Sequence, residues 1–173
     1  MDASFNVVTG QAELNQALFQ VTHGLYVLTA VLDGRPNGQC LDAMMQVTNM
    51  PPRVAIGVGK RTLTHEMIFG SGFFAVNVID RELPDCYDLV RRFGFQSGRK
   101  VDKFDGLSFS EGENGCPLLP NAKAFFECRV VADKTADLGT HSLFVGLVER
   151  AGTREAGSPL TYNEYRAAMK KGR

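Results

Sequence analysis

Residues 37–65 read NGQCLDAMMQVTNMPPRVAIGVGKRTLTH and combine turn residues, a short strand and the start of a helix. The strand covers residues 54–59. Side chains alternate along a strand, so the two valines and the isoleucine share one face, and the alanine and two glycines share the other. A face with almost no side chains lets another group come close to the backbone. The strand therefore favours a flat ligand lying against it.

Basic and hydroxyl side chains follow this strand directly. Lys60 and Arg61 come first, and Thr62 and Thr64 stand where a helix is expected to begin. A helix N-terminus offers free N–H groups and a partial positive charge, which suits a phosphate. The alternative is a basic turn before an ordinary capped helix, and taken alone the stretch favours that alternative, because such caps are common.

Composition limits the class of protein. The chain of 173 residues fits a single domain, residues 1–173, and its apolar and charged fractions, 44% and 22%, are those of a globular protein. Nineteen basic and nineteen acidic residues balance, which removes the electrostatic argument for nucleic acid or an anionic membrane as a partner. No apolar run approaches a membrane span and the N-terminus lacks a signal peptide pattern, so we expect a cytoplasmic protein.

Cysteine and histidine spacing does not suit a metal site. The cysteines, Cys40, Cys86, Cys116 and Cys128, form no C-x-x-C pair, and the three histidines are scattered. Local spacing therefore predicts neither zinc nor iron–sulfur ligation. In a cytosolic chain these thiols are expected to be small core residues rather than disulfides.

Periodicity and turn signals predict about seven strands and few helices. Strands are expected at residues 24–33, 39–48, 54–59, 73–79, 107–110, 122–132 and 140–148, and helices at residues 11–19, 64–69, 84–95 and 162–171. Asp33-Gly34 and Asn37-Gly38 are expected to be turns, and residues 117–120 a bend. Many strands with short turns predict a mainly β protein, an antiparallel barrel with peripheral helices. No G-x-G-x-x-G motif follows a strand, so a Rossmann domain is not indicated.

Short stretches in order across nearly the whole chain resemble one family. They are HGLYVLT (23–29), NGQCLD (37–42), QVT (46–48), KRTLTH (60–65), SGFFAVNV (71–78), FGFQSGR (93–99), DKF (102–104), GTHSLFVG (139–146) and PLTY (159–162). The ordered set resembles the flavin reductase-like, FMN-binding split-barrel family. Within it, the branch of flavoredoxins, ferric reductases and flavin domains of high-molecular-weight rubredoxins is the most similar.

This resemblance implies a Greek-key split β-barrel that forms a homodimer, with FMN in two clefts near the interface. Family members take hydride from NADH or NADPH and pass electrons to free flavin, ferric chelates or a redox protein. By resemblance, the flavin ring and ribityl chain lie against Gln39, Cys40, Leu41, Asp42, Gln46, Val47 and Thr48, and the phosphate lies against Lys60, Thr62, Thr64 and His65. The phosphate assignment agrees with the helix start deduced from the residues.

The chain departs from relatives where they usually carry Thr-Ala-Asn, because it has Cys40-Leu41-Asp42. Cys40 is either a reactive thiol or a compact spacer, and the spacer is favoured. Asp42 replaces an amide with a carboxylate. Because a negative charge disfavours an anionic reduced flavin, we hypothesise a lowered potential, which Asp42→Asn would raise.

Three further assignments keep an alternative. His141 matches a position near the flavin and nicotinamide and could donate or relay a proton, but a hydrogen-bonded histidine at a strand end is the commoner case. Gln46 and Thr48 could bind the flavin ring or form a polar outer face. A loop carrying Phe93, Ser97, Arg99 and Lys103 could bind a dinucleotide phosphate or be a solvated basic loop.

The sequence therefore predicts an FMN-containing oxidoreductase that moves electrons from NAD(P)H through flavin to a small-molecule or protein acceptor. One alternative is an FMN-binding electron carrier that does not oxidise NAD(P)H. Another is an FMN-binding module without turnover.

Overall fold

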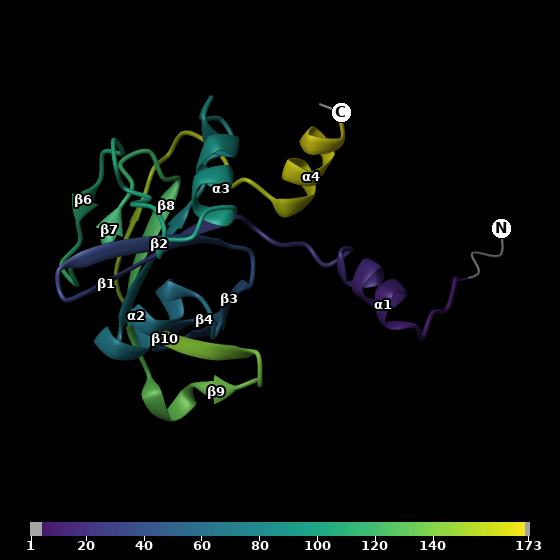
Figure 1. Ribbon diagram of the computed structural model, residues 1–173, viewed down its shortest axis with the longest axis horizontal. Helices are drawn as coiled ribbons and strands as arrows, with labels where there is room; N and C mark the ends of the chain where they lie inside the picture. Colours follow the sequence, from purple (N-terminus) through teal and green to yellow (C-terminus); the bar gives the residue numbers. More distant parts are fainter. Residues whose placement is uncertain (1–4, 172–173) are drawn as a thin grey trace.

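Most strands of the protein belong to one antiparallel sheet that curls into a barrel (Figure 1). The computed structural model describes residues 5–171. Its strands are β1 (Tyr26–Leu32), β2 (Arg35–Leu41), β3 (Met44–Asn49), β4 (Pro52–Gly59), β5 (Phe73–Val78), β6 (Ser110–Glu111), β7 (Pro117–Leu118), β8 (Ala124–Val130), β9 (Ala136–Asp137) and β10 (His141–Thr153). Its α-helices are α1 (Gln11–Leu18), α2 (Leu63–Ser71), α3 (Cys86–Gly94) and α4 (Tyr162–Lys171).

The barrel is open along one seam. The strand order is β2-β1-β5-β8-β10-β4-β3, with β9 added to β10, while β6 and β7 form a separate pair. Within the described residues, β2 and β3 pair with one neighbour each and not with one another. An antiparallel sheet that closes on itself except for two edge strands is a split barrel, which confirms the predicted fold class.

Apolar side chains from both halves of the sheet meet inside the barrel. Leu28, Ile56, Phe74 and Phe144 come from β1, β4, β5 and β10, and all four are fully buried in one cluster. Helix α2 closes one side of this cluster with Met67 and Ile68. The alternation of apolar residues along the strands thus produces the core expected from the sequence.

The first hairpin turns at Asp33 and Gly34, and not at both predicted sites. Asp33 and Gly34 have φ angles of 52° and 73°, and the residue pairs between β1 and β2 continue up to Leu32 and Arg35, directly beside the turn. Two positive φ angles define the two-residue turn that best matches strand twist. Asn37-Gly38, also predicted to be a turn, lies inside β2, where a Cβ on Gly38 would come 2.9 Å from the Phe93 ring. The close approach of α3 explains this glycine.

The strand predicted over residues 39–48 was also wrong. It is divided into β2 and β3, which lie at opposite edges of the sheet, and Asp42 and Ala43 connect them across the seam. Residues 107–109 form no strand because pairing starts only at Ser110, and the expected bend at residues 117–120 begins with β7. Short segments without alternation give too little pattern to fix such boundaries.

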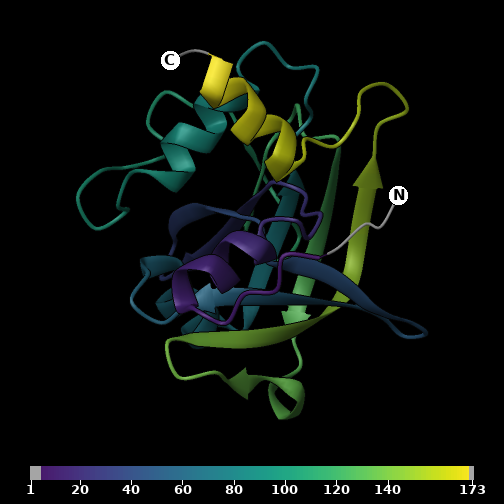
Figure 2. The same cartoon turned by 90° about the vertical axis from the view of Figure 1, so that its right-hand side faces the viewer.

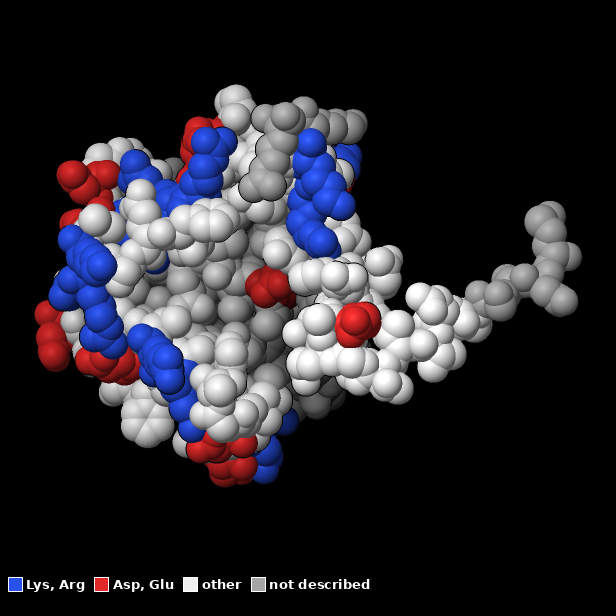
Figure 3. Space-filling view, turned by 45° about the vertical axis from the view of Figure 1, so that its right-hand side comes forward, with Lys and Arg blue, Asp and Glu red and all other residues white. Residues whose placement is uncertain are grey.

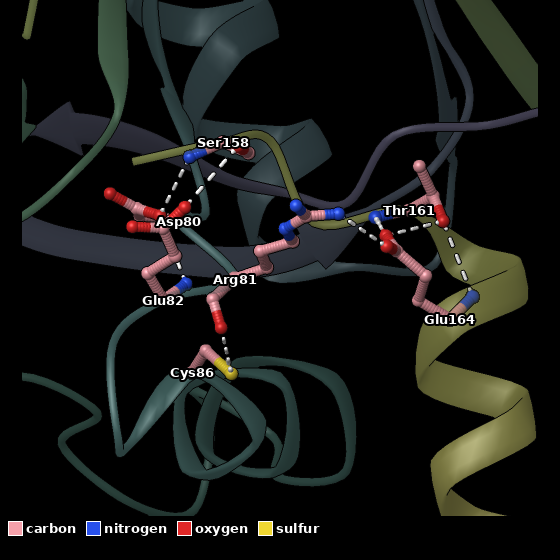
Figure 4. Close-up of polar contacts among 7 residues, drawn as sticks. All are labelled: Asp80, Arg81, Glu82, Cys86, Ser158, Thr161 and Glu164. Carbon is pink, nitrogen blue, oxygen red and sulfur yellow. Dashed lines mark hydrogen bonds and ion pairs between the residues drawn. The ribbon is translucent and has the colours of Figure 1, made fainter. Parts of the chain in front are cut away.

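Polar contacts fix the segment that leads into α4 (Figure 4). Asp80, just after β5, accepts the N–H of Ser158 at 3.1 Å, and Arg81 pairs with Glu164 at 2.9 Å. Thr161 and Glu164 exchange side-chain and backbone hydrogen bonds at the start of α4, an arrangement that satisfies two otherwise free N–H groups. Helices α4 and α3 consequently lie side by side at one end of the barrel (Figure 2).

Helix α1 stands apart from the barrel in Figure 1, and none of its residues is buried. Directly after its last residue, the ring of Phe19 has the guanidinium of Arg166, in α4, 3.9 Å from its centre. Within residues 5–171, no helix has the length and apolar character needed to cross a membrane.

Candidate functional site

A cleft of about 370 Å³ follows the free edge of β2. It lies between the start of α2, the end of α3 and the loop of residues 96–103. Its lining is Asn37, Gln39, Cys40, Arg61, Thr62, Leu63, Thr64, Phe93, Gly94, Gln96, Ser97, Gly98, Arg99 and Lys103. The volume is within the range of small-molecule sites.

The charged residues that line the cleft all carry the same sign. Arg61, Arg99 and Lys103 are basic, and no aspartate or glutamate is among the described lining residues. Arg99 is bridged at its outer end to Glu66 of α2, with 2.7 Å between the two side chains. Figure 3 shows one hollowed face of the molecule, with Lys and Arg side chains at several places around the hollow and an acidic side chain at its edge. The cleft suits an anionic ligand.

The first turn of α2 adds backbone donors to this basic lining. The Thr62 hydroxyl caps the helix by accepting the His65 N–H at 3.1 Å. The N–H groups of Leu63 and Thr64 come before that bond, and no partner for them occurs in the described part of the chain. Free N–H groups at a helix start attract anions such as phosphate.

Asn37 fixes the position of this helix start relative to β2. Its amide donates to the Thr64 hydroxyl at 2.9 Å, and both side chains are buried. Thr64 therefore lines the cleft with a hydroxyl oxygen that already accepts one hydrogen bond. Gly98 packs directly on the Asn37 amide, and Arg35 donates to the Gly98 carbonyl at 2.8 Å, which ties the loop to the same strand.

Gln39 contributes an acceptor without a donor. Its Oε1 atom is buried and has no hydrogen-bond partner in the described structure. Buried polar atoms are nearly always paired, so an exception in a cleft indicates a missing partner. A ligand with an N–H or O–H group would complete this site. A flavin mononucleotide has ring N–H and ribityl O–H donors and a phosphate, so the residues fit it.

Cys40 lies beside Gly94, at the point where α3 crosses β2. Burial, together with the nearby Asp42 carboxylate, raises the pKa of the Cys40 thiol to about 12. A thiol must lose its proton to react, and this one remains protonated at neutral pH. The structure thus favours the compact spacer over the reactive thiol.

The cleft brings together half of the residues singled out from the sequence. They are Gln39, Cys40, Thr62, Thr64, Phe93, Ser97, Arg99 and Lys103. The two groups assigned separately to cofactor and substrate thus share one cavity. Lys103 is buried rather than solvated, which differs from the basic-loop alternative.

Five of the remaining assigned residues lie at or beyond the seam. Leu41 points into the core, and Asp42 is half-buried where the chain leaves β2. The Gln46 and Thr48 side chains bond within the β3–β4 hairpin, to Asn49 and Pro51 respectively. Val47 is exposed at a bulge of β3. These side chains do not line the cleft.

Three other assigned residues surround the start of β10. Lys60 pairs with Asp137 at 2.5 Å, and His141 is exposed beside Gly59, with its Nδ1 2.9 Å from the Thr140 hydroxyl. The His65 ring bonds Ser142 at 2.8 Å instead of facing the cleft. Burial, helped by the charge of Lys60, lowers the pKa of His65.

Sequence reasoning did not assign Asn37, Leu63, Gly94, Gln96 or Gly98 to the cleft. Asn37 and Gly38 gave a turn signal, which concealed their place in a strand. A better guide was the alternation of Asn37 with Gln39, because residues two apart on a strand share a face. For Gln96 and Gly98 no local signal exists, since only the folded loop brings them to β2.

The chain belongs to the flavin reductase-like family, and its fold agrees with that of solved structures from the family. The family's sequence pattern, described as a flavin reductase like domain, matches residues 18–169. The chain is 40% identical over 151 residues to a high molecular weight rubredoxin of Moorella thermoacetica, in an alignment that covers 87% of this chain and 64% of that protein.

Two further similarities have nearly full coverage. The chain is 36% identical over 159 residues to a ferric-chelate reductase (NAD(P)H) of Archaeoglobus fulgidus, which covers 91% of each chain. Among solved structures, the NADH:FAD oxidoreductase SgcE6 of Streptomyces globisporus superposes with a TM-score of 0.80 at 26% identity, with 93% of each chain covered. These similarities confirm the family resemblance seen in the sequence.

Proposed function

We propose that this protein is an FMN-binding oxidoreductase that takes electrons from NAD(P)H and passes them to free flavin, a ferric chelate or a redox protein. The observation that carries the proposal is the cleft beside β2. Its described lining has three basic residues and no acidic one, and a buried acceptor on Gln39 has no partner within residues 5–171. The reductases to which the chain is similar support it.

The residues of the cleft divide into two groups by chemistry. Arg61 and the free N–H groups of Leu63 and Thr64 would hold the phosphate, and Gln39 would accept a hydrogen bond from the ribityl chain or ring. The Cys40 side chain is small enough to leave room for the flavin, and its thiol stays protonated. When bound, the flavin would accept a hydride from a nicotinamide and pass the electrons on to the acceptor.

His141, Asp42, Gln46, Val47 and Thr48 remain proposals for the ring end. They lie outside the described cleft, at the seam or on the strands beside it. Asp42 lies where the chain crosses the open seam between β2 and β3, next to the cleft residues Gln39 and Cys40 in the sequence, so its carboxylate would act on a ring held at that end. The lowered potential expected from the Asp42 carboxylate stays a prediction, as does the cytoplasmic location.

The test is an anaerobic visible spectrum of the protein loaded with FMN, recorded before and after NADH or NADPH is added. We expect a protein-bound flavin band that bleaches with the nicotinamide. A chain that takes up no flavin would contradict the whole proposal. Transfer from the reduced protein to a ferric chelate or free FMN, followed in the same cell, would then identify the acceptor.

A second candidate is an electron carrier that receives its electrons from another protein. The 40% identity to a high molecular weight rubredoxin favours this candidate. It predicts a bound flavin that stays oxidised with NADH and NADPH and is reduced by a reduced iron protein. The same spectra therefore distinguish the two functions.

We also propose a homodimer. Helix α1 has no buried residue, and the outer side of β3 and its hairpin carry exposed Met45, Val47 and Met50. Exposed apolar side chains that gather on one surface often mark a protein–protein interface. A second copy would cover it and would place its own residues near the seam.

A further inference from the structure

Lys103 brings a positive charge into the cleft without a carboxylate to balance it. Its side chain is 5% exposed, and its Nζ donates to the carbonyl of Gly38 at 2.9 Å and to that of Phe93 at 3.1 Å. No carboxylate of the described residues lies within ion-pair distance of this Nζ. A buried ammonium without an opposite charge is unfavourable.

The neighbouring elements do not supply the missing negative charge. On β2, the Cys40 thiol is protonated and Arg35 is cationic, and Asp42, which follows the strand, forms no ion pair with the Lys103 ammonium in the described structure. On α3, Arg92 donates to the backbone carbonyls of Lys103 and Asp105. In the loop itself, Asp102 accepts the Phe104 N–H at 2.8 Å. The other charged groups at the cleft are Arg61 and Arg99, of which Arg99 is paired with Glu66.

The Lys103 ammonium also has one N–H donor that the described hydrogen bonds do not use. A lysine side chain has three N–H groups, and the two carbonyls use two of them. Because Lys103 lines the cleft, a ligand oxygen can take the third. The need for a negative charge and the spare donor both point to an anionic oxygen, and the most anionic group of a flavin nucleotide is its phosphate.

We propose that Lys103 couples the binding of this phosphate to the binding of one proton, so that the cleft takes up flavin nucleotide with Lys103 in its ammonium form. The inference rests on the proposed function. It adds that affinity depends on pH through a single residue of the loop.

The sign of the effect follows from the free protein. Burial lowers the pKa of Lys103 from 10.5 to about 8. Below that pH the ammonium is already present, and the affinity for FMN is constant. Above it a proton must be taken up on binding, so the dissociation constant rises about tenfold per pH unit until the pKa of the complex is reached. The phosphate of FMN, with a second pKa of about 6, is a dianion throughout this range.

The experiment is calorimetric titration of the full chain with FMN, in two buffers of different ionisation enthalpy, at pH values of about 7 and about 9. We expect almost no proton uptake at the lower pH, most of one proton at the higher pH, and roughly tenfold weaker binding there. Riboflavin, which lacks the phosphate, should bind without uptake. Equal uptake with riboflavin and FMN would overturn the assignment to the phosphate.

Two substitutions test the residue. Lys103→Arg keeps the charge but does not titrate, so binding should lose both the uptake and the pH dependence. Lys103→Met should bind FMN about tenfold to a hundredfold more weakly near pH 7, again without uptake. Lys100→Met, an exposed lysine of the same loop, is the matched control and should behave like the unchanged protein.

The failures are distinguishable. If the unchanged protein binds no FMN at any pH, the proposed function falls and this inference falls with it. If FMN binds with equal affinity and no proton uptake at both pH values, the inference alone is overturned. The unchanged protein gives this answer even if Lys103→Met does not fold.

Discussion

Gln39 shows at the scale of one residue how a binding site is left incomplete by folding. Its Oε1 is buried with no partner, although almost every other described polar side-chain atom in the interior is paired. Such an atom costs free energy in the empty protein, and a donor on a ligand recovers it. A substitution of Gln39 should therefore affect the stability of the ligand-free protein and the affinity for the ligand in opposite ways.

We expect Gln39→Met, a substitution of similar volume, to leave the free energy of unfolding unchanged or raise it by about 1 kcal/mol, because the unpaired acceptor disappears. FMN should bind about tenfold more weakly, since the ligand loses one hydrogen bond. Chemical denaturation of the empty protein and FMN titration measure the two effects. Gln16→Met on exposed α1 is the control, and a loss of stability without loss of affinity would show that Gln39 is merely structural.

Individual residues of the site could be predicted where the chain marks them locally. Thr62 and Thr64 follow a strand and open a helix, which is enough to place them together. The buried state of Lys103 could not be deduced, because the two carbonyls that hold it belong to β2 and α3, distant in sequence. From its position in a loop, Lys103 was expected to be exposed to solvent.

At the scale of elements, the loop of residues 96–103 depends on how closely it approaches β2. A Cβ on Gly98 would overlap the Asn37 amide, which cannot move aside because it is buried and bonded to Thr64. The loop therefore covers one side of the cleft only while residue 98 has no side chain.

Gly98→Ala should destabilise the protein by about 1–3 kcal/mol through this overlap and weaken FMN binding by displacing the loop. Gly106→Ala is the matched control: its φ of 67° is strained for alanine, but a Cβ there meets open space. It should lower stability with no effect on FMN affinity. Thermal melts and FMN titrations of both variants check this, and unchanged affinity in Gly98→Ala would mean that the loop does not border the ligand.

Periodicity predicted most elements because burial repeats along them. The bounds of the strand at residues 54–59 and the helix at residues 64–69 differ by at most two residues from those of β4 and α2, and the helix at residues 162–171 has the bounds of α4. It failed at the seam, where β2 and β3 follow one another without a turn signal and yet pair with different neighbours. Which neighbour a strand chooses is decided by the whole sheet and not by its own residues.

At the scale of the whole molecule, α1 lacks the packing contacts that usually stabilise a short helix. An eight-residue helix is marginally stable in water, and most of its stability must come from packing. Yet Leu18 is 62% exposed, and Phe5, in the segment before the helix, is 93% exposed. The exposed Met50 hairpin of the same chain presents a second apolar surface. Exposed apolar surface of this kind is covered when a protein binds a partner, and a second copy is the partner proposed above.

We therefore expect the protein to be a dimer in solution and the double substitution Leu14→Gln and Leu18→Gln to convert it to a monomer. The two leucines lie four residues apart, so they share one face of α1, and replacing them removes apolar area from the proposed interface. Light scattering coupled to size exclusion gives the mass of each species across a range of protein concentrations. Gln16→Glu, on another side of the helix, should leave the dimer intact. If the unchanged protein runs as a single chain at every concentration, α1 must be covered by something other than a second copy. If only the double variant is monomeric and its FMN affinity also falls, the second copy contributes to the cleft at the seam.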